Sequence, residues 1–422
     1  MKRNRLKQIF IVLIAISLLF LSACGGGGND KKSNEGSGKD HQNVLKVSVD
    51  GMYIDYLNEI KSDFEKEHRV TVEITEKDMF ETLEALALDG PAGIAPDVMI
   101  APYDRVGNLG QQGHLAEISL PEDGRYDDTD KQQVTINGKI YGAPFVIETL
   151  VLYYNKNLID DAPTTFEELE ALAKDDRFAF ESEKGKSTAF LANWVDFYMT
   201  YGLISGYGGY VFGNDGTDTT DIGLNTEEAI EGIEYAVKWY QEIWPQGMLD
   251  VSTASNFIDT QFTSAKAAAI IGGPWSAATY KEAGIDFGVS KIPTLPNGEE
   301  YQPFAGGKAW VISNYSKNKE LAAEWINYIT NEVQQQKLYE MLNEVPANQG
   351  TREIVASGDD DLARAVIEQY HSAVPMPNIP EMAEVWTGAE NLMFDAASGK
   401  KTAEQSANDA VQIIKENIEQ KY

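Results

Sequence analysis

The chain has 422 residues, of which 66 are acidic and 35 are basic, so its formal net charge is −31. Its 43% apolar content excludes a globally disordered chain and, with the length, predicts roughly two to three domains of ~150 residues each. The acidic excess, without a basic stripe interleaved with aromatics, argues against nucleic acid as a partner, because phosphates need clustered Lys and Arg.

The single cysteine, Cys24, excludes intramolecular disulfides and thiolate metal clusters. It follows a start with four basic residues, an apolar run over residues 9–21, and the small residues Ser22 and Ala23. This order is typical of an export signal. The apolar run, about 13 residues, is shorter than the ~17 to 25 that usually span a bilayer, so a permanent transmembrane helix is not expected.

The four residues that end at this cysteine, Leu21-Ser22-Ala23-Cys24, resemble the bacterial lipobox. The resemblance implies that residues 1–23 are a lipoprotein signal peptide and that the thiol of Cys24 is acylated after cleavage. Acyl chains, at ~0.8 kcal/mol per buried methylene, hold a protein at a membrane surface without a spanning helix. A plain secretory signal is the alternative. Residues 24–43, rich in Gly, Ser, Asn and Lys, predict a flexible tether behind the lipid anchor.

The globular part opens with apolar residues that alternate as in a strand at 45–49, recur at helical spacing over 57–64, and alternate again at 70–74. A helix between two short strands usually makes them parallel neighbours, so the chain is predicted to open as an α/β domain. A helix over residues 80–88 and a short strand at 98–100 continue the pattern.

The same alternation restarts near residue 150, with a strand at 151–154 and capping-box spacing at 164–168 ahead of a helix. A helix through residues 230–240 and a strand at 267–271 follow, and strongly helical segments cover 320–342 and 402–420. Because the pattern restarts without an internal repeat, it indicates two α/β lobes.

Motifs for metal or phosphate chemistry are missing. The four histidines, His41, His68, His114 and His371, are scattered and none has the H-E-x-x-H spacing. There is no phosphate loop, no G-x-S-x-G elbow and no G-x-G-x-x-G after a strand. Nothing selects one of the many carboxylate pairs as a glycosidase acid and base. The sequence therefore predicts no catalytic residue, no metal and no cofactor.

Aromatic residues next to carboxylates stand out in segments that read as loops at strand ends. Carbohydrate recognition needs this mixture, because the faces of a sugar ring are apolar and stack on aromatics while its hydroxyls need polar partners. Each aromatic taken alone is more often a core residue. The segments are Pro102-Tyr103-Asp104-Arg105, Trp194-Val195-Asp196-Phe197-Tyr198, Pro274-Trp275 and Val385-Trp386.

At these residues the sequence resembles the solute-binding proteins of ABC importers for maltose and maltodextrins, and most closely the lipid-anchored ones of Gram-positive bacteria. The resemblance runs from about Val44 to the C-terminus. It rests on Ala95-Pro96-Asp97-Val98, Tyr103-Asp104-Arg105, Tyr154-Asn155-Lys156, Gly206-Tyr207-Gly208-Gly209-Tyr210, Gly273-Pro274-Trp275 and Pro377-Asn378-Ile379-Pro380-Glu381-Met382.

The resemblance implies an α/β, two-lobe, periplasmic-binding-protein-like fold with a hinge and an interlobe ligand cleft. The first lobe is expected from residues 44–147 plus about 310–357, and the second from about 152–304 plus 362–422. The implied function is non-catalytic: capture of maltodextrins, the linear α-1,4-gluco-oligosaccharides, and delivery to the permease subunits of an ABC importer. The implied location is the outer face of the cell membrane, reached through the lipid anchor. A monomer is expected for this class.

Site residues carried over from the family lie in both lobes. Asp104 and Arg105 would hydrogen-bond sugar hydroxyls from the first lobe, and Glu148 would do so near the first crossover. Their partners in the second lobe would be the carboxylate of Asp196 and the stacking rings of Tyr198, Trp275 and Trp386. Glu81 is a weaker candidate, because the alignment around it needs a gap.

The chain also departs from the best-known pattern of the family. Ala101 stands where a tryptophan is expected, which makes Tyr103 a candidate replacement for the lost stacking ring. The early loop at residues 50–53 lacks an expected basic residue, and Glu390 stands in place of an arginine. Fewer fixed polar contacts near one end favour longer linear chains over the disaccharide. A disaccharide that binds at least as tightly as a trisaccharide would contradict that hypothesis.

Two alternatives remain open at this point. Relatives within the same class carry cyclodextrins or galacto-oligosaccharides, so the sugar is less certain than the architecture. In a different class, a cell-surface amylolytic enzyme would also need aromatics and carboxylates in a cleft. Incubation with maltoheptaose separates binder from enzyme, because only an enzyme would form products.

Overall fold

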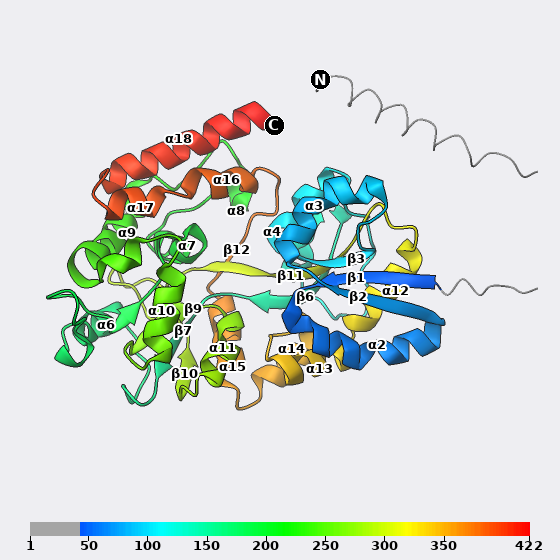
Figure 1. Ribbon diagram of the computed structural model, residues 1–422. Helices are drawn as coiled ribbons and strands as arrows, with labels where there is room; N and C mark the ends of the chain where they lie inside the picture. The colour runs from blue at the N-terminus through cyan, green and yellow to red at the C-terminus, as the bar shows by residue number, and fades with distance from the viewer. Residues whose placement is uncertain (1–42) are drawn as a thin grey trace, which may run out of the picture. The chain divides into compact units, whose positions relative to one another are not determined.

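The computed structural model describes residues 43–422 (Figure 1). The expected signal peptide, the lipobox with Cys24 and nearly all of the expected tether lie outside the described residues. Within residues 43–422, no helix combines the length and the apolar character that crossing a membrane requires.

The first sheet has six strands, and its core is a parallel set in the order β3-β1-β2 with β11 antiparallel to β3. β6 and β12 both pair with β11. The strand-helix-strand opening predicted from the sequence is present, because β1 and β2 pair in parallel on either side of α2. The strands are β1 (Asn43–Val49), β2 (Val70–Glu76), β3 (Val98–Pro102), β6 (Ala143–Glu148), β11 (Phe304–Ile312) and β12 (Val374–Pro375).

Helices in the blue, cyan and yellow parts of Figure 1 accompany the first sheet. In α2, Leu57, Ile60 and Phe64 are buried on one face, as their helical spacing predicts. The helix ends at His68, and the next residue, Arg69, has a left-handed φ of 55° that turns the chain into β2. The elements are η1 (Gly51–Tyr53), α2 (Ile54–His68), α3 (Met79–Ala92), α4 (Tyr103–Gln111), α5 (Asp128–Gln133), β4 (Thr135–Ile136), β5 (Lys139–Ile140), α12 (Lys319–Ile329), α13 (Glu332–Leu342) and α14 (Gln349–Ala356).

The second sheet has four strands in the order β10-β7-β9-β8, with β7 antiparallel to both β9 and β10. The chain passes from the first sheet to the second between β6 and β7, and returns to the first in β11 (Figure 1). The strands are β7 (Val151–Asn155), β8 (Phe190–Leu191), β9 (Ala269–Gly272) and β10 (Phe287–Ser290).

A larger set of helices accompanies the second sheet, and α16, α17 and α18 pack together beside α9, as the green and red ribbons of Figure 1 show. The elements are α6 (Phe166–Leu172), η2 (Asp176–Phe178), α7 (Phe197–Gly206), α8 (Gly213–Gly216), α9 (Glu227–Lys238), η3 (Trp239–Ile243), η4 (Gln246–Leu249), α10 (Ala254–Thr263), η5 (Pro274–Ser276), α11 (Ala277–Glu282), α15 (Asp361–Tyr370), α16 (Met382–Ala389), α17 (Leu392–Ala397) and α18 (Ala403–Lys421).

Each sheet has its own hydrophobic core. Trp310 and Trp325 are buried in the core of the first sheet, and Trp194, Trp239 and Trp244 in that of the second. The second core also includes residues 345, 347 and 355, which the sequence assigns to the first lobe. The two cores fit the expectation of two α/β lobes, while the exact lobe boundaries stay a prediction.

Two helical predictions can be compared residue by residue. The segment expected at 402–420 is α18, and its start carries a capping box between Thr402 and Gln405. The segment expected as one helix at 320–342 is divided into α12 and α13. The division occurs because the side chain of Asn331 accepts a hydrogen bond from the backbone N–H of Gln334 and so caps a new helix.

Candidate functional site

Asp104 and Trp386 meet although they lie on different elements. Asp104 is in the first turn of α4, directly after β3, and Trp386 is in α16. The indole Nε1 of Trp386 donates a hydrogen bond of 3.1 Å to Oδ2 of Asp104, and Arg105 Nε lies 3.4 Å from the same oxygen. Burial raises the pKa of Asp104, while Arg105 and the indole N–H act in the opposite direction. The structure thus joins predicted site residues from both lobes.

Glu148 ends β6 and is held by a buried lysine that the sequence analysis missed. Lys308 Nζ, on the neighbouring strand β11, lies 2.6 Å from Glu148 Oε1 and 3.1 Å from Glu344 Oε1. It also donates to the hydroxyl of Tyr53 at 3.0 Å, and that hydroxyl donates to Glu344 Oε2 at 2.7 Å. Burial raises the pKa of Glu148, which Lys308 opposes and Glu344 reinforces. Two carboxylates, one ammonium and one phenol therefore form a single buried cluster.

The early loop at residues 50–53, which lacks an expected basic residue, contributes one residue to this cluster. Tyr53 belongs to that loop and contacts Lys308 Nζ. A signal for Lys308 was available in the sequence: it is a single charged residue inside Phe304–Ile312, an otherwise apolar strand that is buried throughout.

The aromatic candidates gather around Phe304 at the start of β11. The ring of Tyr198 lies 6.1 Å from that of Phe304, and the ring of Trp386 lies 5.9 Å from it. Trp275 is 6.3 Å from Tyr198. The Tyr198 hydroxyl would be 3.7 Å from a Cβ added to Gly306, the residue that pairs with Glu148 across the sheet. Tyr198 therefore approaches the carboxylate at the crossover.

Trp275 presents its ring to solvent, with 42% of the residue exposed. It lies in η5, directly after β9. The indole folds back over Gly273, where an added Cβ would meet ring atoms at 2.1 Å. A glycine is therefore required for this ring position. An exposed indole beside other aromatics is suited to stacking on an apolar face of a ligand.

Asp196 and Glu81 both lie at the start of helices. Asp196 is exposed and caps α7, because its Oδ1 accepts a hydrogen bond of 2.9 Å from the backbone N–H of Tyr198. Glu81 is exposed in the first turn of α3. Within residues 43–422, no hydrogen bond or ion pair joins the Glu81 carboxylate to another candidate residue. The Asp196 carboxylate, in contrast, accepts a hydrogen bond from the backbone of the candidate Tyr198.

Tyr103 differs from the sequence-based expectation. Its side chain is fully buried and donates a hydrogen bond of 3.3 Å to the carbonyl of Val146. Successive helical residues point ~100° apart, so Tyr103 faces the core where its neighbour Asp104 faces Trp386. The ring therefore has no free face, and the expectation that it replaces the stacking surface lost at Ala101 is wrong for this conformation.

A second charged cluster lies where α5 meets α14. Arg352 Nη2 contacts Asp130 Oδ2 at 2.6 Å, and its Nη1 contacts Asp127 Oδ2 at 3.1 Å. Asp130 is fully buried, and burial raises its pKa to about 6 against the opposing effect of Arg352. A hollow of about 290 Å³ adjoins Arg352 and is also lined by Tyr370 and His371.

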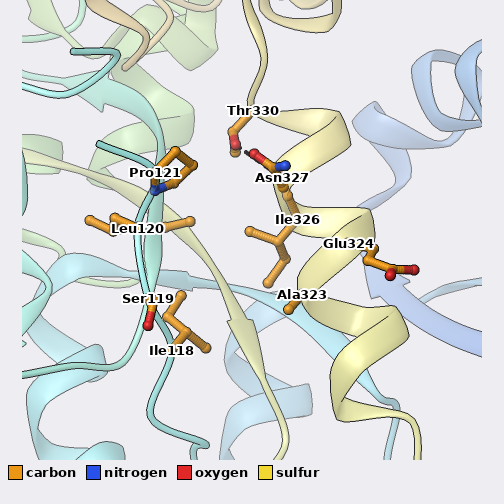
Figure 2. A pocket seen from close by; sticks show the side chains of 10 residues that line it. Ile118, Ser119, Leu120, Pro121, Ala323, Glu324, Ile326, Asn327 and Thr330 are labelled. Carbon is orange, nitrogen blue, oxygen red and sulfur yellow. Dashed lines mark hydrogen bonds between the residues drawn. The ribbon is translucent and has the colours of Figure 1, made fainter. Parts of the chain in front are cut away.

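Another hollow, of about 420 Å³, lies between the loop at residues 118–121 and α12. Figure 2 shows Leu120 and Pro121 facing Ile326 across it, while the side chain of Glu324 points away. Glu324 instead pairs with His68 at 3.0 Å. The lining shares no residue with the candidate set, and it is mostly apolar. Within residues 43–422, no group of three or more His, Cys, Asp or Glu is arranged to hold a metal ion.

Known proteins support the architecture. The family model described as bacterial extracellular solute-binding protein matches residues 59–366. The chain is 58% identical over 418 residues to the maltodextrin-binding protein MdxE of Bacillus subtilis (strain 168), and the match covers 99% of each chain.

Two solved structures are similar over most of the chain. The maltose-binding protein MalE of Listeria monocytogenes, in complex with maltose, has a TM-score of 0.84 and 64% identity, and the match covers 90% of this chain and 99% of that one. MalX of Streptococcus pneumoniae, in complex with maltopentaose, has a TM-score of 0.86 and 50% identity, covering 88% and 100%.

These similarities confirm the predicted α/β periplasmic-binding-protein fold. They also confirm the prediction of a binding protein rather than an enzyme, because the matching family is one of solute-binding proteins. The chain belongs to the family of bacterial extracellular solute-binding proteins.

Proposed function

We propose that this protein captures maltodextrins at the outer face of the cell membrane and delivers them to the permease subunits of an ABC importer. A lipid on Cys24 holds it there. The observation that carries the proposal is the contact between Asp104 and Trp386, which joins a hydroxyl-binding carboxylate to a stacking ring. Relatives named for maltodextrin binding, and solved relatives that hold maltose and maltopentaose, support the choice of sugar.

The chemistry of the site suits a linear glucan. Tyr198, Trp275 and Trp386 offer ring faces for the apolar faces of glucose. Asp104 and Glu148 offer carboxylate oxygens to hydroxyls, and Arg105 offers donors. Stacking places the sugar and the few polar groups orient it, which is the usual division of labour in a small-molecule site.

Closure of the two lobes follows from this division. A ligand closes a hinge only by contacting the closed form better than the open form. Glu148 lies on β6 of the first sheet and Asp104 on α4, which follows β3 of that sheet, whereas Tyr198 and Trp275 lie on elements that accompany the second sheet. A glucan that touches both sets supplies the difference in affinity, and the closed, loaded monomer is the form that docks on the permease.

Isothermal titration of the purified protein tests the sugar. We expect maltose, maltotriose and maltoheptaose to bind, with the longer chains binding more tightly than the disaccharide. Heat from β-cyclodextrin or a β-galacto-oligosaccharide, with none from the linear glucans, would keep the importer role and replace the substrate. Release of glucose or shorter glucans from maltoheptaose over hours would instead indicate an amylolytic enzyme.

The anchor is tested separately in cells. The wild-type protein is expected in the membrane fraction with the mass of an acylated Cys24, and Cys24→Ser is expected to lose both properties. A Cys24→Ser variant that stays in the membrane fraction would contradict the lipid anchor. Growth on maltodextrin after deletion of the gene, with and without complementation, tests delivery to the importer.

A further inference from the structure

Lys308 occupies an unusual position for a lysine. Its strand, β11, is buried from end to end, and the residue is only 9% exposed. A buried ammonium costs several kcal/mol unless charged partners compensate for the lost hydration. Such a residue therefore needs a reason beyond the sheet itself, since a leucine or methionine would fill the same space without this cost.

The partners of Lys308 are arranged unequally. Glu344 has both oxygens engaged, Oε1 by Lys308 and Oε2 by the hydroxyl of Tyr53. Glu148 has only Oε1 engaged by Lys308. Its Oε2 has no hydrogen-bond partner among residues 43–422, and it is not among the side-chain atoms that are sealed from solvent without a partner. One oxygen of Glu148 is therefore fixed and the other is available.

We propose that Lys308 is a positioning residue of the sugar site, whose ammonium holds Oε1 of Glu148 so that the ionised Oε2 accepts a sugar hydroxyl. This role rests on the proposed function. The lysine itself does not need to touch the ligand, and its contribution is made through the orientation and the charge of Glu148.

Electrostatics explain why a cation is needed at this point. The titratable groups that face Lys308 and Glu148 are Asp50, Tyr53, Tyr198 and Glu344. Burial and the neighbouring carboxylates raise the pKa of Glu148, and Lys308 is the group that opposes them. Burial alone would lower the pKa of Lys308, but Glu148 and Glu344 raise it well above its ordinary value. The ammonium thus stays charged and favours the ionised form of Glu148.

Removal of the ammonium has a predictable sign. Without Lys308, burial, Glu344 and Asp50 still raise the pKa of Glu148 and the ammonium that lowers it is gone, so this carboxyl binds a proton at a higher pH than in the wild type. A protonated carboxyl is a poorer acceptor for a hydroxyl than a carboxylate. Affinity should therefore become dependent on pH and should rise as the pH rises.

The experiment titrates maltotriose into the wild type, Lys308→Met and Glu344→Gln between about pH 6 and pH 8.5. Methionine fills the volume without charge, and Glu344→Gln is the matched control that alters the cluster but keeps the pair of Lys308 and Glu148. We expect the wild type and Glu344→Gln to keep a constant Kd within about threefold. Lys308→Met should bind at least about tenfold more weakly at pH 6 and recover by about tenfold per pH unit at most.

The possible results separate the hypotheses. A folded Lys308→Met protein with the wild-type Kd at every pH would overturn the positioning role. An equal loss in Lys308→Met and Glu344→Gln that does not change with pH would overturn it too, because it would mark the cluster as structural. If Lys308→Met does not fold, the double variant Lys308→Met/Glu344→Gln removes one charge of each sign. Its affinity must still rise with pH, over a lower pH range, because Glu344 no longer raises the pKa of Glu148. A wild type that binds no maltotriose would instead overturn the proposed function, and this role with it.

Discussion

The indole N–H of Trp386 donates to the carboxylate of Asp104 at 3.1 Å, which joins two residues 282 positions apart in the chain. Asp104 lies in the first turn of α4 and Trp386 lies in α16. The contact means that the carboxylate expected to accept a sugar hydroxyl is oriented by the ring expected to stack on the sugar. The polar and the apolar halves of the site are therefore coupled through a single hydrogen bond.

Two substitutions at Trp386 should separate these two contributions. Trp386→Ala is expected to weaken maltotriose binding by roughly 1 to 3 kcal/mol, because both the ring and the N–H are lost. Trp386→Phe keeps an aromatic face and removes only the hydrogen bond, so a loss of about 0.5 to 1.5 kcal/mol is expected. Isothermal titration measures both. Equal losses would mean that stacking contributes nothing, and unchanged affinity in both would remove Trp386 from the site.

The exposed ring of Trp275 should matter for binding and not for folding. Trp275→Ala is expected to cost roughly 1 to 3 kcal/mol in affinity and to change the free energy of unfolding by less than about 0.5 kcal/mol. The matched control is Trp194→Ala, because Trp194 is fully buried and its Nε1 donates to the hydroxyl of Tyr301. That variant should lose about 3 to 5 kcal/mol of stability in urea unfolding. If Trp275→Ala instead lost stability and Trp194→Ala lost only affinity, Trp275 would be the structural residue and Trp194 the binding residue.

Gly273→Ala offers a way to move the Trp275 ring without removing it. The added methyl would meet the indole at 2.1 Å, while φ at Gly273 is −95°, which alanine tolerates. We expect weaker maltotriose binding at nearly unchanged stability. In the double variant Gly273→Ala/Trp275→Ala the affinity should equal that of Trp275→Ala alone, because the methyl acts only through the ring. Additive losses would show that Gly273 acts in another way.

Asp104→Asn should lower affinity while leaving the fold intact. Burial raises the pKa of Asp104, so the folded state binds its proton more tightly than the unfolded chain does, and ionisation costs stability as the pH rises through that pKa. Asparagine removes this cost near pH 7, and the benefit should vanish below about pH 4. Loss of a carboxylate from the first turn of α4 opposes it by about 0.3 to 1 kcal/mol. Thermal unfolding of the sugar-free protein should therefore shift little, and a large fall in Tm would mark Asp104 as structural.

The buried Asp130 should make the free energy of unfolding depend on pH in mild acid. Its pKa is about 6 when folded and 3.8 in its ordinary state, so the folded protein holds the proton more tightly and the stability from this group is lost as the pH rises from 3.8 through 6. The free energy of unfolding of Asp130→Asn should lack this fall, which amounts to at most about 3 kcal/mol.

Urea unfolding at pH 4.5 and pH 7 measures the effect of Asp130. The control is Asp127→Asn, which removes the other carboxylate that contacts Arg352 and leaves Asp130 to titrate. The wild type should show the full fall in stability. Asp127→Asn should show a smaller fall, because the Asp127 carboxylate helps to raise the pKa of Asp130, and Asp130→Asn should show none. If the free energy of unfolding changed equally with pH in all three proteins, the titrating group would not be Asp130.

Part of the fold was predictable because it is local. The alternation of β1, α2 and β2 follows from the periodicity of apolar residues over a short stretch. The pairing of β11 with β3 and β6 joins segments that are far apart in the chain, and periodicity carries no information on such pairings. The division at Asn331 was visible in principle, because asparagine is a preferred N-cap, but it was outweighed by the helical pattern on both sides.

The candidate site residues could be named only where they have a pattern in the sequence, and their role in sugar binding stays a prediction. Asp104, Glu148 and Trp386 were identified through a family resemblance and lie close to the partners described above. Lys308 is visible in the sequence as the one charge in an apolar stretch. Its partners Tyr53 and Glu344 are distant in the chain, so the sequence does not show what that charge contacts. Tyr103 was misplaced because adjacency in sequence says nothing about direction: one helical step turns a side chain by ~100°.

The strand β11 also fixes the distance between two parts of the candidate site. Phe304, around which the aromatic rings gather, and Lys308, which holds Glu148, are four residues apart on it, about 13 Å at ~3.3 Å per residue. Both side chains point to the same face, because the period of a strand is two. The distance between the aromatic cluster at Phe304 and the charged cluster at Lys308 is thus set by a fixed length of backbone. An insertion of one residue between Phe304 and Lys308 would turn one of the two side chains to the opposite face of the sheet. Substitutions can therefore change either cluster, but a single insertion cannot change their spacing without removing one of them from the site.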